Sequence, residues 1–454
     1  MKDDILEARL IFLDEQLERA ENALRWLEGS QILQNLGYDM QKIAAPLETT
    51  IVKEARLQRK SIERAQAELN LAAAGSTGEP HLAAAWQMYN QSLEKSQELL
   101  GQWLELIGGI ALRDKQFDCN VCDLADELIR TCCDDTIGPT IKAPDLFVTV
   151  PAQQDAVSKT WFRMIRLRFP HWTVWHLPLT ASEFGYVLFD EWDDLSEFLD
   201  EQVKLWGRPG DKQKPAPKTG PRRRNIKSHL RKLIADGFAA LTMGPAYAYS
   251  AFYLNFSAGR AETEDLPSDA ARAFVVLRMI DLMNQHESEK PYREHIERLD
   301  EKWKASCKFA EDQERQTELE EGKLNSLCRA VWNFLNDQFR FTGRYPYLNG
   351  DQGWNTAQRI RRHLENPQQY PMSFTSSTRL RDVLNAGWLR RIEIPAGAEH
   401  DFQVKQLAKA IMALCRHIVD QRRGIPARAE QPQQGSIQIP TLGGGAEVKT
   451  VGGR

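Results

Sequence analysis

Apolar residues recur at alternating spacings of four and three along the N-terminal part of the chain. Charged residues, mostly Glu and Arg, fill the positions between them. This spacing places one apolar stripe along an α-helix. The stripe consists of Leu6, Leu10, Leu13, Leu17, Ala20, Leu24 and Leu27, and the pair Gly29-Ser30 predicts the end of the helix.

Two further segments repeat this pattern. One runs from about Met40 to Ala74, and Pro46 predicts its true start, because proline is tolerated only in the first turn of a helix. The next follows a break at 75–80 and carries its stripe from Leu82 to Ile107. These helices predict an antiparallel helical bundle or coiled coil over residues 1–112. The stripes can close within the chain or on a partner protein.

Helical patterns dominate the remainder, so the expected fold class is mainly α with little β-structure. Residues 113–290 form the expected core, in which the run Asp145–Val150 is the one strand predicted. Residues 291–424 predict a helical C-terminal domain. Residues 425–454 are rich in Gly, Pro and Gln and predict a disordered tail. In the core, helices are expected at 117–135, 180–189 and 193–206. Two further core helices are expected to begin near 225 and 268, and the first of them breaks at 243–245. In the C-terminal domain, one helix is expected to begin near 322 and two more to cover 376–389 and 402–421.

Composition excludes several classes of protein. The chain has 454 residues, 42% hydrophobic and 27% charged, with a net charge of -4, which is ordinary for a globular protein. Its seven cysteines are odd in number and scattered, unlike a disulfide framework. The first ten residues are too charged for a signal peptide, and no apolar run is long enough to span a membrane. We therefore expect a cytoplasmic protein without membrane contact.

One segment carries the pattern of a catalytic helix. Zinc peptidases with an H-E-x-x-H motif place two histidines on one helical face, with a glutamate between them as general base. Residues 182–186 read Ser182-Glu183-Phe-Gly-Tyr186 in that frame, so the glutamate is present and both histidines are replaced. Downstream, Lys232-Leu-Ile-Ala-Asp236 fits an E-x-x-A-D pattern with lysine in the first position.

A third stretch adds to these two. The run 266–272, Leu-Pro-Ser-Asp-Ala-Ala-Arg, is similar to an H-P-x-x-x-x-R sequence without its histidine. Together the motifs make residues 145–290 resemble the gluzincin-type zinc metallopeptidases. The resemblance implies that Ser182, Tyr186 and Lys232 occupy the zinc-ligand positions, that Glu183 occupies the base position, and that Asp236 supports a ligand from outside the metal shell.

The replacements predict loss of activity. Serine and tyrosine are poor zinc ligands at neutral pH, and the lysine cation would repel zinc. We expect Lys232 to pair with Glu183 or Asp236 as a structural link in place of a metal. We therefore expect no metal, no cofactor and no catalytic residues. An alternative is a peptidase with atypical ligands, recruiting His171, His176 or His229.

A basic insertion at 207–225 supplies a different candidate site. Residues 208–232 hold ten basic residues and one acidic residue. Such a run can bind phosphate groups or an acidic partner, or it can be a solvated loop. The candidate anion-binding residues are Arg222, Arg223, Arg224, Lys227 and Arg231.

Two weaker signals carry less information. The pairs Cys119/Cys122 and Cys132/Cys133 lack the spacing of a complete zinc site. Walker A, GxSxG and GxGxxG motifs are absent from the sequence. The sequence thus predicts a pseudoenzyme that acts as a scaffold or adaptor, with partners contacting the N-terminal helices. A bacterial multi-protein system is one setting for such a role. Binding of nucleic acid through 208–232 is a second alternative.

Overall fold

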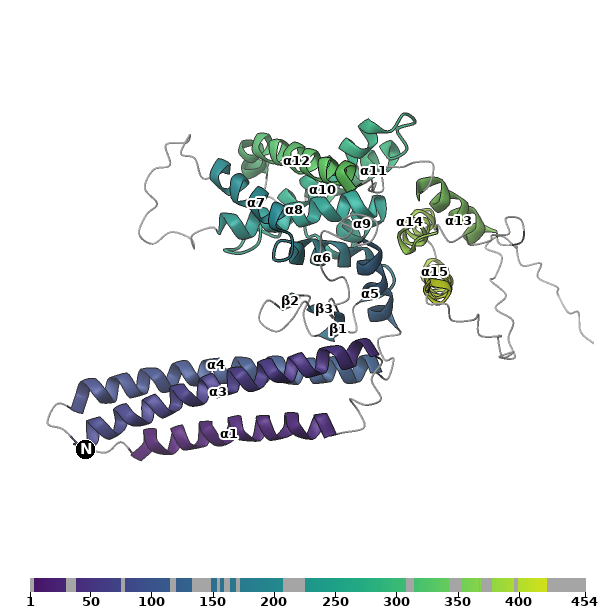
Figure 1. Ribbon diagram of the computed structural model, residues 1–454. Helices are drawn as coiled ribbons and strands as arrows, with labels where there is room; N and C mark the ends of the chain where they lie inside the picture. Colours follow the sequence, from purple (N-terminus) through teal and green to yellow (C-terminus); the bar gives the residue numbers. More distant parts are fainter. Residues whose placement is uncertain are drawn as a thin grey trace, which may run out of the picture. The chain divides into compact units, whose positions relative to one another are not determined.

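The structure is a computed structural model with a mainly α fold (Figure 1). It describes residues 4–29, 38–74, 78–114, 120–132, 148–152, 156–158, 164–168, 172–206, 225–307, 314–342, 353–366, 368, 378–395 and 399–422. The described residues divide into two compact units. The first contains residues 1–122 and 146–170, and the second contains 123–145 and 171–454.

Long helices build most of the first unit. Helix α1 spans Asp4–Gly29, α3 spans Tyr38–Ala74 and α4 spans Gly78–Asp114, and Figure 1 shows them running side by side. The predicted start of the second helix at Pro46 is wrong, because α3 begins at Tyr38 and continues through this proline.

The apolar stripe of α1 is buried within the chain. Leu6, Leu10, Leu13 and Leu17 are at most 1% exposed, and α1 packs against α3 and α4. On α3, Ala65 and Leu69 are fully buried in the same way. At these positions the stripes close on one another and are not available to a partner. Burial of each leucine contributes on the order of 1.5–3 kcal/mol relative to exposure.

A small sheet completes the first unit. Strand β1 covers Val148–Ala152, β2 covers Ala156–Ser158 and β3 covers Met164–Arg168. Their order is β1-β3-β2, with β1 parallel and β2 antiparallel to β3. The sequence predicted β1 two to three residues early and missed β2 and β3. The side chain of Arg113 on α4 donates to the carbonyl of Thr149, which ties β1 to that helix (2.7 Å).

Helix α8 (Ile226–Met243) lies at the centre of the second unit. It packs against α6 (Thr180–Leu188), α7 (Asp193–Trp206), α10 (Asp269–His286) and α12 (Glu314–Thr342) (Figure 1). Its residues from Leu233 to Met243 are all buried, so it serves as the core of this unit.

The break predicted after Met243 is present. Gly244 has a φ of 62°, which favours glycine, and Pro245 begins α9 (Pro245–Ser250). The Asn385 side chain accepts from the backbone N–H of Ala246 and donates to the carbonyl of Met243, so it satisfies both sides of the break (2.9 and 2.8 Å).

The remaining described helices lie in this same unit, apart from the first two residues of α5. They are α5 (Val121–Cys132), α11 (Arg293–Cys307), α13 (Asn355–Glu365), α14 (Leu380–Arg391) and α15 (His400–Arg422). The expected helix at 117–135 corresponds to α5, whereas α13 was not predicted. The expected helix from 322 starts earlier, at Glu314.

The predicted domain boundaries differ from this grouping. The strands at 148–168 group with the N-terminal helices, and the predicted core and C-terminal domain form one compact unit. The basic insertion from 207 to 224 and the tail from 425 to 454 lie outside the described residues. Within the described part of the chain, no helix is both long and apolar enough to cross a membrane.

Candidate functional site

Helices α6 and α8 approach each other closely at Gly185. A Cβ atom on this glycine would lie 3.0 Å from Cδ1 of Phe238 and 3.2 Å from the carbonyl oxygen of Ala235. Only a residue without a side chain fits there comfortably. Phe184 and Phe238 pack edge to face beside this contact. This close packing brings the polar residues of the two helices into hydrogen-bond range.

Asp236 on α8 is the centre of the buried polar cluster and is completely inaccessible to solvent. Its Oδ1 accepts hydrogen bonds from the hydroxyls of Ser182 (2.6 Å) and Tyr247 (2.7 Å). Its Oδ2 accepts from Nε of Arg272 (2.7 Å), and Nη2 of the same guanidinium reaches Oδ1 (3.2 Å). The carboxylate therefore accepts four hydrogen bonds from three side chains.

The charge of Asp236 is stabilised by cations on two helices. Burial works to raise the pKa of this carboxyl, but the charges of Arg272 and Lys232 outweigh burial and hold it below its usual value. Burial works against the charged form of Arg272 too, but Asp236 raises its pKa above the ordinary value. Burial and the neighbouring Asp236 raise the pKa of Tyr247, so its phenol remains a neutral donor.

Lys232 links the cluster to Glu183. Its Nζ lies 2.8 Å from Oε1 of Glu183, donates to the Ser182 hydroxyl at 3.0 Å, and lies 3.9 Å from Oδ1 of Asp236. The Lys232 side chain is 8% exposed and that of Glu183 is 21% exposed. The ammonium group thus lies between the two carboxylates, as expected from the lysine at this position.

The structure therefore brings together four of the five residues singled out by the motifs, namely Ser182, Glu183, Lys232 and Asp236. Tyr186 is placed differently. Its ring lies against the guanidinium of Arg231 (4.2 Å), and its carbonyl accepts hydrogen bonds from Arg231 Nε and Nη2 (3.0 and 2.7 Å). Because Arg231 also pairs with Asp190 (2.6 Å), it anchors the end of α6 to α8.

Two members of the cluster were not assigned from the sequence. Tyr247 lies on α9, after the helix break, and its hydroxyl donates a hydrogen bond to Asp236. Arg272 was noted in the 266–272 stretch, but not as the partner of Asp236. It also donates to Asp269 on its own helix (3.2 Å). The i+3 spacing of Asp269 and Arg272 is the one local signal that a sequence could offer for this network.

The alternative ligands do not join this cluster. The ring of His229 is buried, and its Nε2 lies 2.8 Å from the carbonyl oxygen of Thr263. The Nδ1 of His176 lies 3.2 Å from the hydroxyl of Thr173. His171 lies outside the described residues. Among the described side chains, no group of three or more His, Cys, Asp or Glu is arranged to hold a metal ion.

The cysteine motif is only partly described. Cys122 and Cys132 on α5 are buried. Their neighbours Cys119 and Cys133 lie outside the described residues. Of these four cysteines the structure therefore places two, both inside the protein.

The candidate anion-binding residues are also only partly described. Lys227 pairs with Asp200 (2.7 Å) and Arg231 with Asp190 (2.6 Å), so each faces a carboxylate of its own chain. The pairing of Lys227 lowers the pKa of Asp200 through the hydrogen bond and the positive charge. Arg222, Arg223 and Arg224 lie outside the described residues.

The arrangement limits the chemistry available at this site. A serine beside a lysine can act as a nucleophile with its base. Here Ser182 is 2% exposed, its hydroxyl donates a hydrogen bond to Asp236, and its oxygen accepts one from Lys232. The Ser182 hydroxyl is therefore shielded from solvent and hydrogen-bonded to both neighbours.

Comparisons with protein-family models, curated proteins and solved structures found no match to this chain.

Proposed function

We propose that the protein is a non-catalytic, cytoplasmic scaffold or adaptor whose central helices retain a metallopeptidase-like arrangement without its chemistry. One observation carries the first part of this proposal. The ammonium of Lys232 lies between Ser182 and Glu183, in the position that the resemblance gives to a zinc ligand. A carboxylate that neutralises a lysine at 2.8 Å is not free to activate a water molecule.

The network is well suited to a structural role. Asp236 connects α8 to α6 through Ser182, to α9 through Tyr247 and to α10 through Arg272. A buried carboxylate with several charge-assisted hydrogen bonds fixes the relative positions of the elements that carry its donors. The role proposed for these residues is therefore to hold the core in one arrangement.

Peptide hydrolysis tests the proposed loss of catalysis. The full chain and its Glu183→Gln variant are incubated with a mixed peptide library in the presence of zinc, and the products are quantified by mass spectrometry. Glu197→Gln is the matched control, because Glu197 is exposed on α7 and the same change is made outside the network. We expect background hydrolysis for all three proteins. Hydrolysis that is lost in Glu183→Gln and kept in Glu197→Gln would establish a peptidase instead.

The outer face of α1 supports the scaffold part of the proposal. Its leucine stripe is buried, whereas Ile11 and Phe12 are 53% and 57% exposed. Large apolar side chains exposed next to each other on a helix are typical of a surface that contacts another protein. A protein partner is therefore proposed to contact this face.

A partner that binds α1 can be tested with purified proteins. A protein recovered with the chain in stoichiometric amounts is purified and titrated against wild type, an Ile11→Ser/Phe12→Ser variant and a Leu71→Ser control, since Leu71 is 52% exposed on α3. The proposal expects binding to be lost in the double variant and kept in the control. Equal affinity for all three proteins contradicts the assignment of this face. Nucleic acid bound through Arg222, Arg223 and Arg224 would favour the alternative function.

A further inference from the structure

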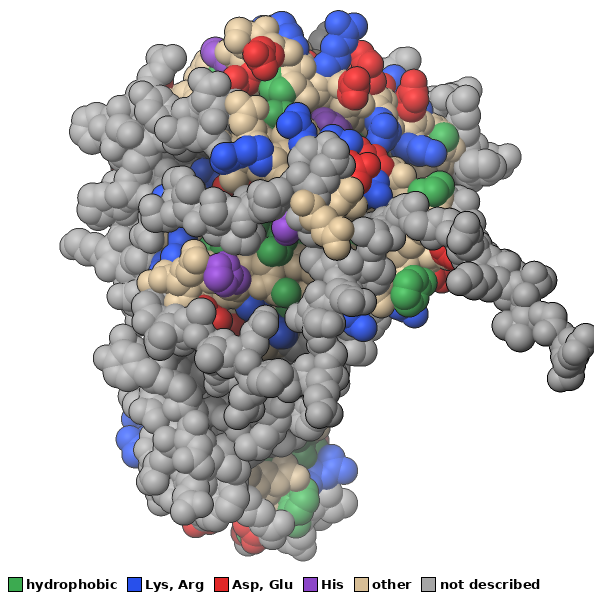
Figure 2. Space-filling model, turned by 90° about the vertical axis from the view of Figure 1, so that its right-hand side faces the viewer, with side chains coloured by type: hydrophobic (Ala, Val, Ile, Leu, Met, Phe, Trp, Pro, Cys, Tyr) green, Lys and Arg blue, Asp and Glu red, His purple; other side chains and the backbone are tan. Residues whose placement is uncertain are grey.

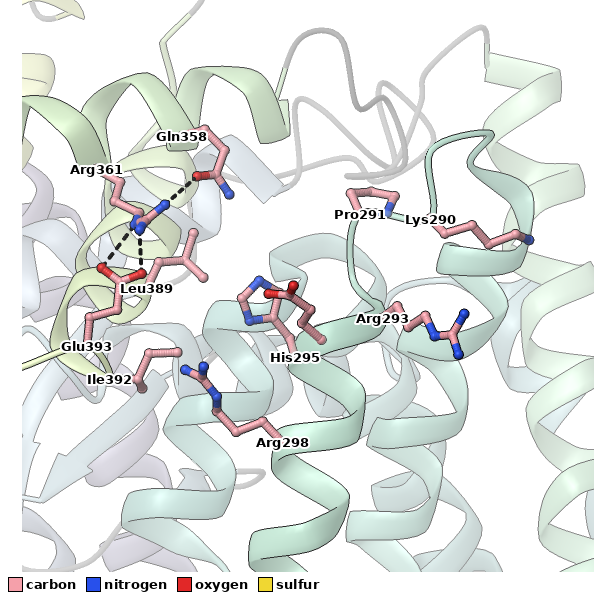
Figure 3. Close-up of a pocket in the computed structure, with 11 residues that line it drawn as sticks. Lys290, Pro291, Arg293, His295, Arg298, Gln358, Arg361, Leu389, Ile392 and Glu393 are labelled. Carbon is pink, nitrogen blue, oxygen red and sulfur yellow. Dashed lines mark hydrogen bonds and ion pairs between the residues drawn. The ribbon is translucent and has the colours of Figure 1, made fainter.

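A cavity of about 390 Å³ lies between α11, α13 and the end of α14, apart from the Asp236 network (Figure 3). Its volume is in the lower part of the range of small-molecule pockets, about 300–1,000 Å³. Leu389 and Ile392 form an apolar part of its wall. A space of this size and mixed lining is suited to a small organic molecule.

Basic residues dominate the charged lining, but they do not all face the cavity. In Figure 3, Lys290 and Arg293 point away from it. Lys290 donates to the carbonyl of Gln285 (3.3 Å), and Arg293 pairs with Glu297 (2.9 Å). These two residues are therefore not the ones that would hold a ligand.

Arg361 and Arg298 face the cavity from opposite sides (Figure 3). Arg361 is neutralised by Glu393 (2.5 Å) and donates to Oε1 of Gln358 (3.2 Å), which leaves the amide nitrogen of Gln358 as a further donor. No carboxylate of the described residues forms an ion pair with Arg298. Of the three arginines that line the cavity, Arg298 is thus the one without an ion-pair partner among the described residues, and its guanidinium points between His295 and Ile392.

His295 lies beside Arg298 and is held in place by its neighbours. Its Nδ1 lies 2.8 Å from the hydroxyl of Tyr249, and its ring packs edge to face on Trp354 (5.5 Å). Burial, together with the charges of Arg298 and Arg361, lowers the pKa of His295 to about 4. The positive surroundings that disfavour a charged imidazole favour an anion.

The positive character is local to the cavity. Glu294 also lines it, and over the described residues on the face in Figure 2 basic and acidic side chains are interspersed. A long polyanion, which needs a continuous basic surface, does not match this pattern. A compact anionic group placed against one arginine does.

We propose that this cavity binds a small molecule carrying a phosphate or carboxylate group, with the anionic group on Arg298 and the rest of the ligand against Leu389 and Ile392. The site is independent of the proposed loss of catalysis, because it shares no residue with the Asp236 network.

Calorimetric titration of the full chain with inorganic phosphate, pyrophosphate and citrate tests this site. Arg298→Gln removes the proposed anchor. Arg293→Gln is the matched control, because it removes the same charge from the same helix where the side chain points away. We expect the dissociation constant to rise about ten- to a hundredfold in Arg298→Gln, the loss typical of a charged hydrogen bond, and to stay unchanged in Arg293→Gln.

The choice of anion separates the two chemistries, because preference for pyrophosphate indicates a phosphate ligand and preference for citrate a carboxylate. If Arg298→Gln fails to fold, Arg298→Lys replaces it and should bind with intermediate affinity, because it keeps the charge but loses the planar fork of donors. No binding of any of the three anions at millimolar concentration overturns the proposal. So does an equal weakening in both arginine variants, which would indicate general surface charge.

Discussion

Replacing Arg272 by methionine removes the main counter-charge of a buried carboxylate. Arg272 and Asp236 have side chains 7% and 0% exposed, and two hydrogen bonds of 2.7 and 3.2 Å join them. Removing one partner of a buried ion pair costs about 3–5 kcal/mol, because the other charge stays buried without compensation. Lys232 lies 3.9 Å from Asp236 and keeps part of the compensation, so we expect about 3 kcal/mol.

Urea denaturation, followed by circular dichroism at pH 7, measures this loss. An Asp236→Leu variant and the Arg272→Met/Asp236→Leu double variant complete a thermodynamic cycle. The double variant should lose less stability than the sum of the single ones, because neither buried charge remains. The coupling should be on the order of 1–3 kcal/mol, as for residues in one buried network.

Acid adds a second readout for this pair. A carboxyl whose pKa is lower in the folded state stabilises the fold above its unfolded pKa of 3.8 and loses that contribution as the pH falls through its folded value. In Arg272→Met the pKa of Asp236 should rise, so acid unfolding should begin at a higher pH than in wild type. A loss below about 1 kcal/mol at pH 7, or strictly additive variants, would refute the reasoning.

Three further predictions follow from the same structure. In the same urea assay, Gly185→Ala should destabilise the protein by about 1–3 kcal/mol, because its Cβ would overpack against Phe238 and Ala235. The control Gly322→Ala should be neutral or slightly stabilising, because a Cβ there meets nothing within 4 Å. His295 has a pKa of about 4 in the folded protein against 6.5 when unfolded, so the free energy of unfolding should decrease as the pH falls from about 6.5 towards 4. His295→Gln should remove this part of the pH dependence of stability. An unchanged pH dependence would contradict the burial of the ring. Burial raises the pKa of the Cys328 and Cys415 thiols to about 12, so iodoacetamide should label both more slowly than Cys307. Mass spectrometry of the labelled peptides measures the three rates. Equal rates would show that these helices open readily.

Helices with a long, regular apolar stripe were predictable from the sequence. The stripe of α1 appears as a row of buried leucines, and α7 has the bounds that its pattern predicts, Asp193–Trp206. The break after Met243 was also predictable, since it needs Gly244 at positive φ and Pro245 in the first turn of α9.

Short elements were not predictable for reasons that their residues make plain. Strands β2 and β3 are three and five residues long, and β3 reads Met-Ile-Arg-Leu-Arg, whose alternation is too brief to distinguish from a loop. Helix α13 has a narrow apolar stripe of Ala357, Ile360 and Leu364 among polar residues. Its packing against α14 supplies stability that its own sequence does not indicate.

Four residues of the polar network were assigned from the motifs and two were not. The resemblance implied that the helices carrying Ser182, Glu183, Lys232 and Asp236 pack together, and these four residues do lie together. Tyr247 reaches Asp236 only because α9 folds back after the glycine break, and Arg272 reaches it from a third helix. Such contacts depend on tertiary structure. The resemblance to gluzincin peptidases itself stays a prediction, although it led to four residues that do lie together.

Zinc content tests the central claim most directly, namely that Lys232 and its carboxylates form a structural link where a peptidase would hold a metal. The full chain is loaded with zinc, dialysed against a chelator of moderate affinity, and measured by inductively coupled plasma mass spectrometry beside Glu183→Gln and Glu197→Gln. The account predicts far less than one zinc per chain, with no difference among the three proteins. One zinc per chain that is lost in Glu183→Gln and kept in Glu197→Gln would contradict it.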